Sequence, residues 1–153
     1  SKYVTVNSSG KVTVKKGTPK GTYSIKVSVS AGATGSYKAS SIVKTVKVVV
    51  GDQTVKLGKS SISVKQAKVK KKTQTLKVAV KTSAGKINSA KNVSTDKAAK
   101  KFSVKKASSK QVTVKVPKGT KKGTYLLKVQ IKAPKAAKCA AVTKTVSLKV
   151  VVK

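Results

Sequence analysis

The 153-residue sequence contains no arginine, glutamate, histidine, methionine or tryptophan. Without histidine and glutamate, most general acid–base mechanisms lack a residue that titrates near neutral pH. The only acidic residues, Asp52 and Asp96, are far apart in the sequence and cannot form the carboxylate cluster of a calcium site. The only cysteine, Cys139, excludes an internal disulfide and a zinc site built from cysteine and histidine. We therefore expect no enzyme activity, no metal and no cofactor.

Long apolar runs are also missing. No stretch approaches the roughly 20 apolar residues that cross a bilayer, so we expect no membrane insertion. The sequence begins with Ser1 rather than methionine, which indicates a piece of a longer protein.

What the sequence has in abundance is lysine and valine. All 37 basic residues are lysine, which gives a formal net charge of +35, and 27 residues are valine. Val, Ile and Leu alternate with Lys, Ser and Thr, as in the segments 25–29 (IKVSV) and 112–116 (VTVKV). A period of two places one set of side chains on a buried face and the other in water. The fold class is therefore predicted to be all-β, with lysine covering the solvent faces.

The chain contains an internal repeat. The segment 16–27 (KGTPKGTYSIKV) returns as 118–129 (KGTKKGTYLLKV), with nine of its twelve positions identical. Before it, 11–14 matches 111–114, and after it, 44–46 matches 144–146. A spacing of about 100 residues is typical of tandem domains and not of solenoid repeats. Residues 1–50 therefore correspond to the C-terminal half of a unit, and residues 51–153 form a complete unit.

The complete unit is expected to have seven short strands separated by Gly- and Pro-containing turns. Seven strands in about 100 residues predict an immunoglobulin-like antiparallel β-sandwich. The expected strands lie at 61–64, 73–81, 87–93, 102–105, 111–116, 124–132 and 143–152.

The repeated K-G-T-x-K-G-T-Y-x-x-K-V pattern, following a V-T-V strand, resembles the lysine-rich immunoglobulin-like or cadherin-like repeats of Gram-positive bacterial surface proteins. The resemblance covers 51–152 as a unit and 1–50 as a partial one. It implies a secreted, extracellular module of the cell surface or cell wall, acting as a structural or adhesive spacer. Repeats of that family usually contain some acidic residues, and this chain has almost none. The departure argues against a purely inert spacer.

The half repeat is expected to be incomplete as a folding unit. Four strands, near 3–6, 11–15, 23–30 and 42–50, would form an open sheet with one bare apolar face, and chains this short rarely bury enough surface to fold alone. We expect that face to be covered by upstream residues, by strands from another copy of the chain, or by the 51–153 unit. Its expected residues are Val12, Val14, Ile25, Val27, Val29, Val46 and Val48.

The charge predicts polyanionic partners such as teichoic acid and acidic polysaccharides, bound without specific recognition. The densest lysine run, near residues 68–72, is interpreted either as a polyanion contact or as a solvated loop between two strands. The alternative function is sequence-independent nucleic-acid binding, because without arginine the bidentate reading of guanine is not available. The candidate contact residues are Lys68, Lys70, Lys71, Lys72, Lys121 and Lys122.

Four other features have structural interpretations that we favour. Tyr23 and Tyr125 are expected to be corner tyrosines that bond to nearby backbone, rather than stacking platforms for sugars or bases. The segment 17–21 (GTPKG) reads as a turn, because it lacks the spacing of a phosphate-binding loop. Cys139 is expected to be a buried or idle thiol, with an intermolecular disulfide as the alternative. A lysine–asparagine isopeptide bond at Asn88 or Asn92 would have to rely on Asp52 or Asp96 and is not favoured.

Overall fold

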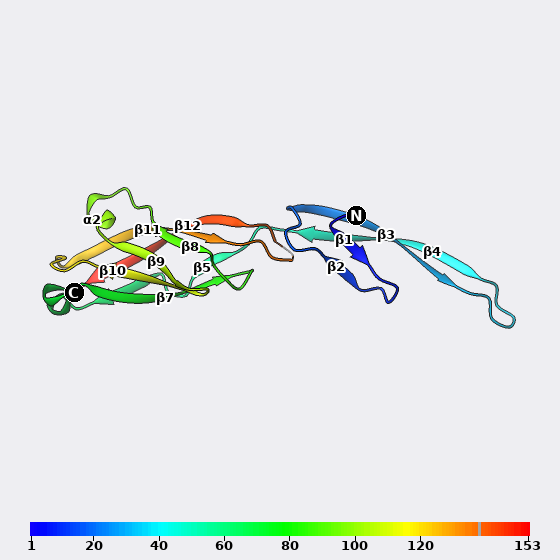
Figure 1. Cartoon of the computed structure of the whole chain (residues 1–153), viewed down its shortest axis with the longest axis horizontal. Coiled ribbons are helices and arrows are strands. Elements are labelled where there is room, and N and C mark those ends of the chain that lie inside the picture. Colours follow the sequence, from blue (N-terminus) through cyan, green and yellow to red (C-terminus); the bar gives the residue numbers. More distant parts are fainter. Residues whose placement is uncertain (138) are drawn as a thin grey trace. The chain divides into compact units, whose positions relative to one another are not determined.

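The computed structural model describes residues 1–137 and 139–153, and nearly all of its regular structure is β-strand (Figure 1). The chain divides into two compact units. Unit 1 comprises residues 1–52 and 136–140, and unit 2 comprises residues 53–135 and 141–153. The all-β fold class expected from the alternation of valine and lysine is therefore confirmed.

Unit 2 is built on a single sheet that has eight strands in the described part of the chain. Their order is β5-β7-β10-β9-β8-β11-β12-β6, and the pairings are antiparallel except for β6, which runs parallel to β12. Each of the seven predicted strands is present, and β5 is an addition whose three residues are too few to show a period. The strands are β5 (Val55–Leu57), β6 (Ser61–Val64), β7 (Gln74–Thr82), β8 (Ser89–Asn92), β9 (Ser103–Ser108), β10 (Gln111–Val116), β11 (Gly123–Ala133) and β12 (Val142–Val152).

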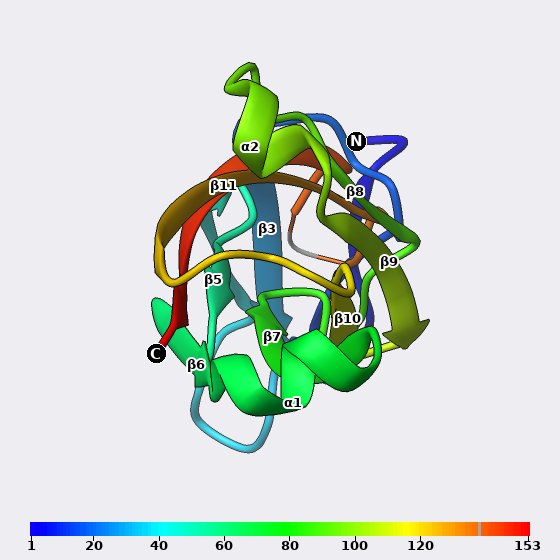
Figure 2. The same ribbon diagram turned by 90° about the vertical axis from the view of Figure 1, so that its left-hand side faces the viewer.

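The sheet of unit 2 curls around its own core, as the strongly curved β11 and β12 in Figure 2 illustrate. A sandwich of two separate sheets was expected. Here the group β5-β7-β10-β9 and the group β8-β11-β12-β6 are joined edge to edge at β8 and β9. The pairing between those two strands consists of one residue pair, Lys91 with Lys105. The two groups therefore form one continuous but weakly joined sheet.

The core of unit 2 lies on the concave side of this sheet and is almost entirely aliphatic. The alternation along each strand decides which side chains enter it: in β11, for example, Leu127, Val129 and Ile131 are fully buried. The period-two placement predicts ten inward-pointing residues in unit 2, and all ten are buried or packed against the core. They are Leu76, Val78, Val80, Val112, Val114, Leu127, Val129, Ile131, Val146 and Leu148.

Two short helices were not expected from the sequence. Helix α1 (Gln66–Lys71) buries Val69 alone, and helix α2 (Lys97–Lys100) buries Ala99 alone. One buried residue in one turn cannot produce a helical stripe in the sequence, which is why neither helix was predicted. The start of α2 did carry a local signal, because the Asp96 carboxylate accepts a hydrogen bond from the backbone N–H of Ala99 as an N-cap.

Unit 1 contains the four strands predicted for it. They form two separate two-stranded antiparallel sheets among the described residues. One pairs β1 (Val4–Val6) with β2 (Val12–Val14), and the other pairs β3 (Gly21–Ala31) with β4 (Ser40–Val50).

Many apolar side chains of unit 1 are poorly covered, although Val4 and Val50 are fully buried. Val29 is 58% exposed and Val12 is 38% exposed, although both lie on the face that the alternation assigns to a core. The other residues expected on this face are half-buried. The face is therefore incompletely covered among the described residues, on two sheets where one open sheet was expected, and what covers it stays a prediction.

Strand register defines the repeat more sharply than the sequence does. In unit 1 Gly21 pairs with Val50, and in unit 2 Gly123 pairs with Val152, so both strands of the hairpin are offset by 102 residues (123 − 21 and 152 − 50). The same offset relates the bridge between Thr34 and Tyr37 to the bridge between Ala136 and Cys139. The predicted match of 44–46 with 144–146 was wrong by two residues, because the lysine and valine alternation fits both alignments and only the hairpin pairing separates them.

Candidate polyanion-binding surface

The repeated K-G-T-x-K-G-T-Y segment builds the same turn in each unit. The Tyr125 hydroxyl donates a hydrogen bond to the backbone carbonyl of Lys121 over 2.9 Å, four residues upstream. In unit 1 the Tyr23 hydroxyl donates to the carbonyl of Pro19 over 2.8 Å. Both tyrosines are therefore corner residues that fix the turn, as favoured from the sequence.

Other features of the turn are also duplicated. The Thr18 hydroxyl donates to the carbonyl of Lys15, and the Thr120 hydroxyl donates to that of Pro117, each over 2.6 Å. Gly17 and Gly119 have φ angles of 88° and 79°, a conformation that residues with a Cβ rarely adopt. The segment is thus a rigid turn and not a phosphate cradle, and in unit 2 it presents Lys118, Lys121 and Lys122 to solvent.

The lysine run at 68–72 is not a loop, contrary to one of its two interpretations. Lys68, Lys70 and Lys71 belong to α1, and Lys72 is its C-cap. Positive charge in the last turn is favourable there, because the helix dipole places partial negative charge at the C-terminus. All four side chains are exposed. Whether they contact a polyanion stays a prediction, but the scaffold beneath them is ordered by burial of Val69.

Three segments that are distant in the sequence meet at one end of unit 2. The backbone N–H of Gly119 donates to the carbonyl of Val69, which ties the repeated turn to α1. The N–H of Gln66 donates to the carbonyl of Lys153, which ties α1 to the end of β12. Figure 2 faces this end, with α1 in front. We call it the lysine-rich end, and its lysines are Lys65, Lys68, Lys70, Lys71, Lys72, Lys101, Lys118, Lys121, Lys122 and Lys153.

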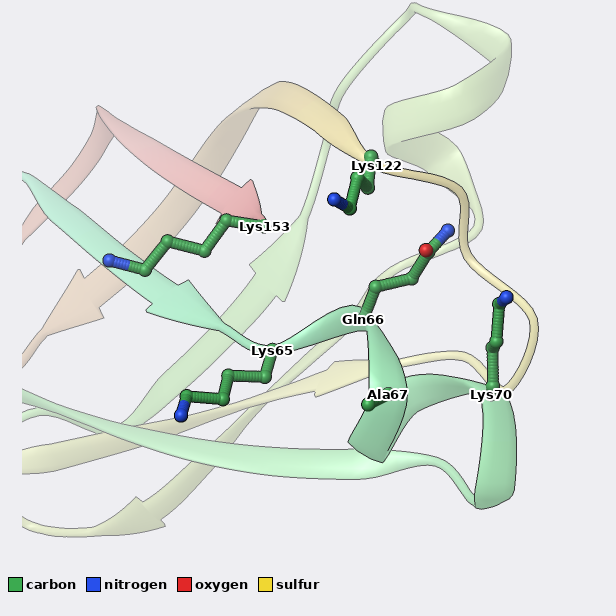
Figure 3. A pocket seen from close by; sticks show the side chains of 6 residues that line it. All are labelled: Lys65, Gln66, Ala67, Lys70, Lys122 and Lys153. Carbon is green, nitrogen blue, oxygen red and sulfur yellow. The ribbon is translucent and has the colours of Figure 1, made fainter.

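The surface of the lysine-rich end is hollowed in several places. One hollow, of about 550 Å³, is open to solvent and is lined by Lys65, Lys70, Lys122 and Lys153 together with Gln66 and Ala67. Figure 3 shows Gln66 and Lys70 projecting from α1 on the same side as Lys122, while Lys65 and Lys153 extend away from them. Lys68, Lys71 and Lys72 line a second hollow with Gln74.

The third hollow is lined by Lys101, Lys118 and Lys121 beside Phe102 and Tyr125. The six candidate lysines therefore share one end but do not converge on one pocket. Sequence reasoning missed Lys65, Lys101, Lys118 and Lys153, which the fold brings there from four different segments. Only the Lys118 signal was visible in the sequence, because it belongs to the repeated motif.

The two carboxylates do not neutralise this end. Asp52 belongs to unit 1, where it accepts from the Lys20 ammonium over 2.6 Å in an exposed ion pair. Asp96 caps α2 and is not among the residues that line the hollows described above. Ten lysines in the absence of a facing acid concentrate anions at the surface, over a distance of about 8 Å at physiological ionic strength. Such an arrangement supports attraction of polyanions by charge.

The remaining candidates from the sequence have structural roles. The Asn92 side-chain amide donates to the carbonyls of Ala99 and Phe102, and its oxygen accepts from Ser94. It is therefore occupied in holding β8 against α2. Cys139 is buried and is paired through its backbone with Gly51 and Ala136. A buried thiol agrees with the favoured interpretation of this residue.

Comparison with known proteins gives no assignment: no family model, no curated protein and no solved structure matches this chain. Among the described residues, no group of three His, Cys, Asp or Glu side chains could hold a metal ion. No helix within the described residues is long and apolar enough to span a bilayer.

Proposed function

We propose that this chain is a tandem immunoglobulin-like module of a bacterial surface protein, in which the lysine-rich end of unit 2 binds polyanions of the cell wall or of acidic glycans. The observation that carries the proposal is the gathering of ten lysines from four segments on one end, with no aspartate among the described residues that line these hollows. Teichoic acid and acidic polysaccharides have the repeated charge that such a surface attracts. The role is structural and adhesive, without chemistry on the bound polymer.

Two features of unit 2 support the immunoglobulin-like relationship. The groups β5-β7-β10-β9 and β8-β11-β12-β6 meet through one residue pair, so a small change at β8 would separate them into the two layers of a sandwich. The hydroxyl of Tyr125 bonds to backbone four residues upstream, and such a tyrosine corner is characteristic of immunoglobulin-like folds.

The aromatic residues favour polysaccharide or teichoic acid over nucleic acid. Binding of single-stranded nucleic acid uses exposed rings on which bases stack. Here Tyr3 packs edge-on against Tyr23, with ring centroids 5.7 Å apart, and Phe102 packs against Tyr125 at 4.9 Å. Tyr37 alone among the described aromatic residues is mostly exposed, at 79%, and it lies in unit 1.

Two variants of equal charge test the proposal. In the end variant, six lysines of the lysine-rich end become glutamine: Lys68, Lys70, Lys71, Lys72, Lys121 and Lys122. In the strand variant, six exposed lysines of unit 2 outside that end become glutamine: Lys77, Lys81, Lys105, Lys106, Lys115 and Lys132. Affinity for teichoic acid, heparin and DNA is measured between low and high salt, with circular dichroism to verify folding.

We expect the end variant to flatten the plot of log K against log salt by about 4–5 units if all six lysines contact the polymer, since each contact contributes about 0.7–0.9. The strand variant should flatten it by about 1 unit or less. Equal slopes in the two variants would show that the lysine-rich end is not the contact. Failure of the parent protein to bind any of the three polymers at low salt would refute the function itself.

A further inference from the structure

Unit 1 repeats the back half of unit 2 but lacks everything that covers that half. In unit 2 the segment 53–101, here called the front half, supplies β5, β6, β7 and β8 together with both helices. Residues 1–52 supply only counterparts of β9 to β12. The structure thus contains two back halves and one front half, and unit 2 shows how a front half and a back half fit.

Apolar side chains at equivalent positions of the two units differ in how exposed they are. With the offset of 102, Val29 corresponds to Ile131, which is fully buried, whereas Val29 is 58% exposed. Val27 and Val48 correspond to Val129 and Val150 in the same way: the residues of unit 2 are fully buried and those of unit 1 are only half-buried. These side chains are thus less covered than their buried counterparts in unit 2, on a hairpin of unchanged register.

The backbone edges show the same deficit. In unit 2, β8 pairs with the segment 129–132 of β11, and β6 pairs with the segment 149–152 of β12. The equivalent edges of unit 1 are 27–30 in β3 and 47–50 in β4. In the described part of the chain β3 and β4 pair only with each other, which leaves the outer edge of each strand open.

The separation of the two sheets in unit 1 has the same cause. In unit 2, β8 lies between β9 and β11 and joins them into one sheet. Unit 1 has no counterpart of β8 among its described residues, so β1–β2 and β3–β4 remain separate. One missing segment thus accounts for the bare apolar face, the open edges and the divided sheet.

From these observations we infer that unit 1 is an acceptor for a front half of the same repeat, covalently joined before β1 as the segment 53–101 is joined before β9. Its β8 would bridge β1 and β3, and its β6 would run parallel to β4 along 47–50. In unit 2 the backbone N–H of Lys153 also bonds to the carbonyl of Val64. The equivalent residue of unit 1, Gly51, is already bridged to Cys139, so the proposed pairing with β6 ends at Val50. The inference does not depend on polyanion binding.

A second copy of the chain is a less suitable occupant. Each copy carries one front half, which already covers its own unit 2, so exchange between copies leaves as many bare back halves as before. Lysines at Lys26, Lys44 and Lys47 also oppose direct edge-to-edge pairing of two β3–β4 hairpins, as lysine on edge strands generally does.

The test is a chain in which a second copy of residues 53–101 is fused directly before Ser1. Amide hydrogen exchange is followed in β3 and β4, with β11 and β12 as internal references. We expect exchange in β3 and β4 to slow by about 100-fold or more relative to the parent chain, toward the values of β11 and β12. If the two identical front halves exchange places, both back halves are still covered and the expected result is unchanged.

The matched control carries Val78→Lys and Val80→Lys in the added copy only. Both valines are buried in unit 2, so the altered copy should not dock, and β3 and β4 should exchange as in the parent chain. A second variant, Val27→Lys in unit 1 of the fusion, should abolish the added protection while β11 and β12 stay protected.

Three results would overturn the inference. The first is unchanged exchange in β3 and β4 of the fused chain. The second is equal protection in the fusion and its lysine control, which would indicate a nonspecific effect of chain extension. The third is strong protection of β3 and β4 in the parent chain itself; sedimentation would then show whether a monomer closes its own core or a dimer covers the face.

Discussion

Val129 and Val27 are the same residue type at equivalent positions of the two units, and their truncation to alanine measures how differently the units are covered. Val129 is fully buried between β8 and β12, whereas Val27 is half-buried on a hairpin with an open edge. Val→Ala removes two carbon atoms, worth about 0.8 kcal/mol each in transfer free energy, and a cavity adds to this where neighbours cannot relax. We expect Val129→Ala to lower the free energy of unfolding of unit 2 by about 2–3 kcal/mol.

Val27→Ala should leave the unfolding of unit 2 unchanged and should cost unit 1 less than about 1 kcal/mol, since part of the side chain is already in water and its neighbours are less tightly packed. Urea unfolding followed at individual amides of β11 and β3 by NMR separates the two units. With an m-value of about 1–3 kcal/mol per M, Val129→Ala should lower the midpoint of unit 2 by about 0.7–3 M. A loss below about 0.5 kcal/mol, or equal losses from both substitutions, would refute the assignment of the core to unit 2.

Two further predictions concern charge and capping in unit 2. Lys56 of β5 lies directly opposite Lys81 of β7, so Lys81→Glu should stabilise unit 2 by up to about 1 kcal/mol at low salt. The gain should shrink in 0.5 M NaCl, which thermal unfolding at both salt concentrations measures. An undiminished gain would mean that charge is not its cause. Asp96→Ala should lower the free energy of unfolding by about 1 kcal/mol, because the N–H of Ala99 loses its acceptor. Asp96→Asn keeps an acceptor and should cost less in the same urea titration. Equal losses from the two substitutions would show that the cap is not the source of the effect.

Much of the fold was predictable because the alternation of apolar and polar residues within each strand indicates which of its side chains are buried. A buried valine next to an exposed lysine needs no knowledge of distant partners, so the strand positions and the inward residues of unit 2 followed from the local pattern. The corner role of Tyr125 was also local, since its hydroxyl reaches a carbonyl only four residues away. The repeated motif predicted the same role for Tyr23.

The candidate surface was only partly predictable. Lys121 and Lys122 lie in the repeated turn, and the 68–72 run is conspicuous in the sequence. Lys153 and Lys101 joined them only because β12 ends beside α1 and because α2 ends beside the turn. Lysine lies on nearly every solvent face. The local sequence therefore does not distinguish a lysine that the fold places in the lysine-rich end from one that lies elsewhere on a strand.

The sequence by itself determined that the chain is β-rich, that its solvent faces are lysine and that one and a half repeats are present. Those properties depend on composition, period and self-similarity, which are local or directly visible. Only the tertiary structure decided that the strands of unit 2 form one curled sheet, because that depends on which edges meet at β8 and β9. The offset of 102 between β4 and β12 was likewise fixed by hairpin pairing, since a two-residue shift preserves the alternation of faces while changing every partner across the strands.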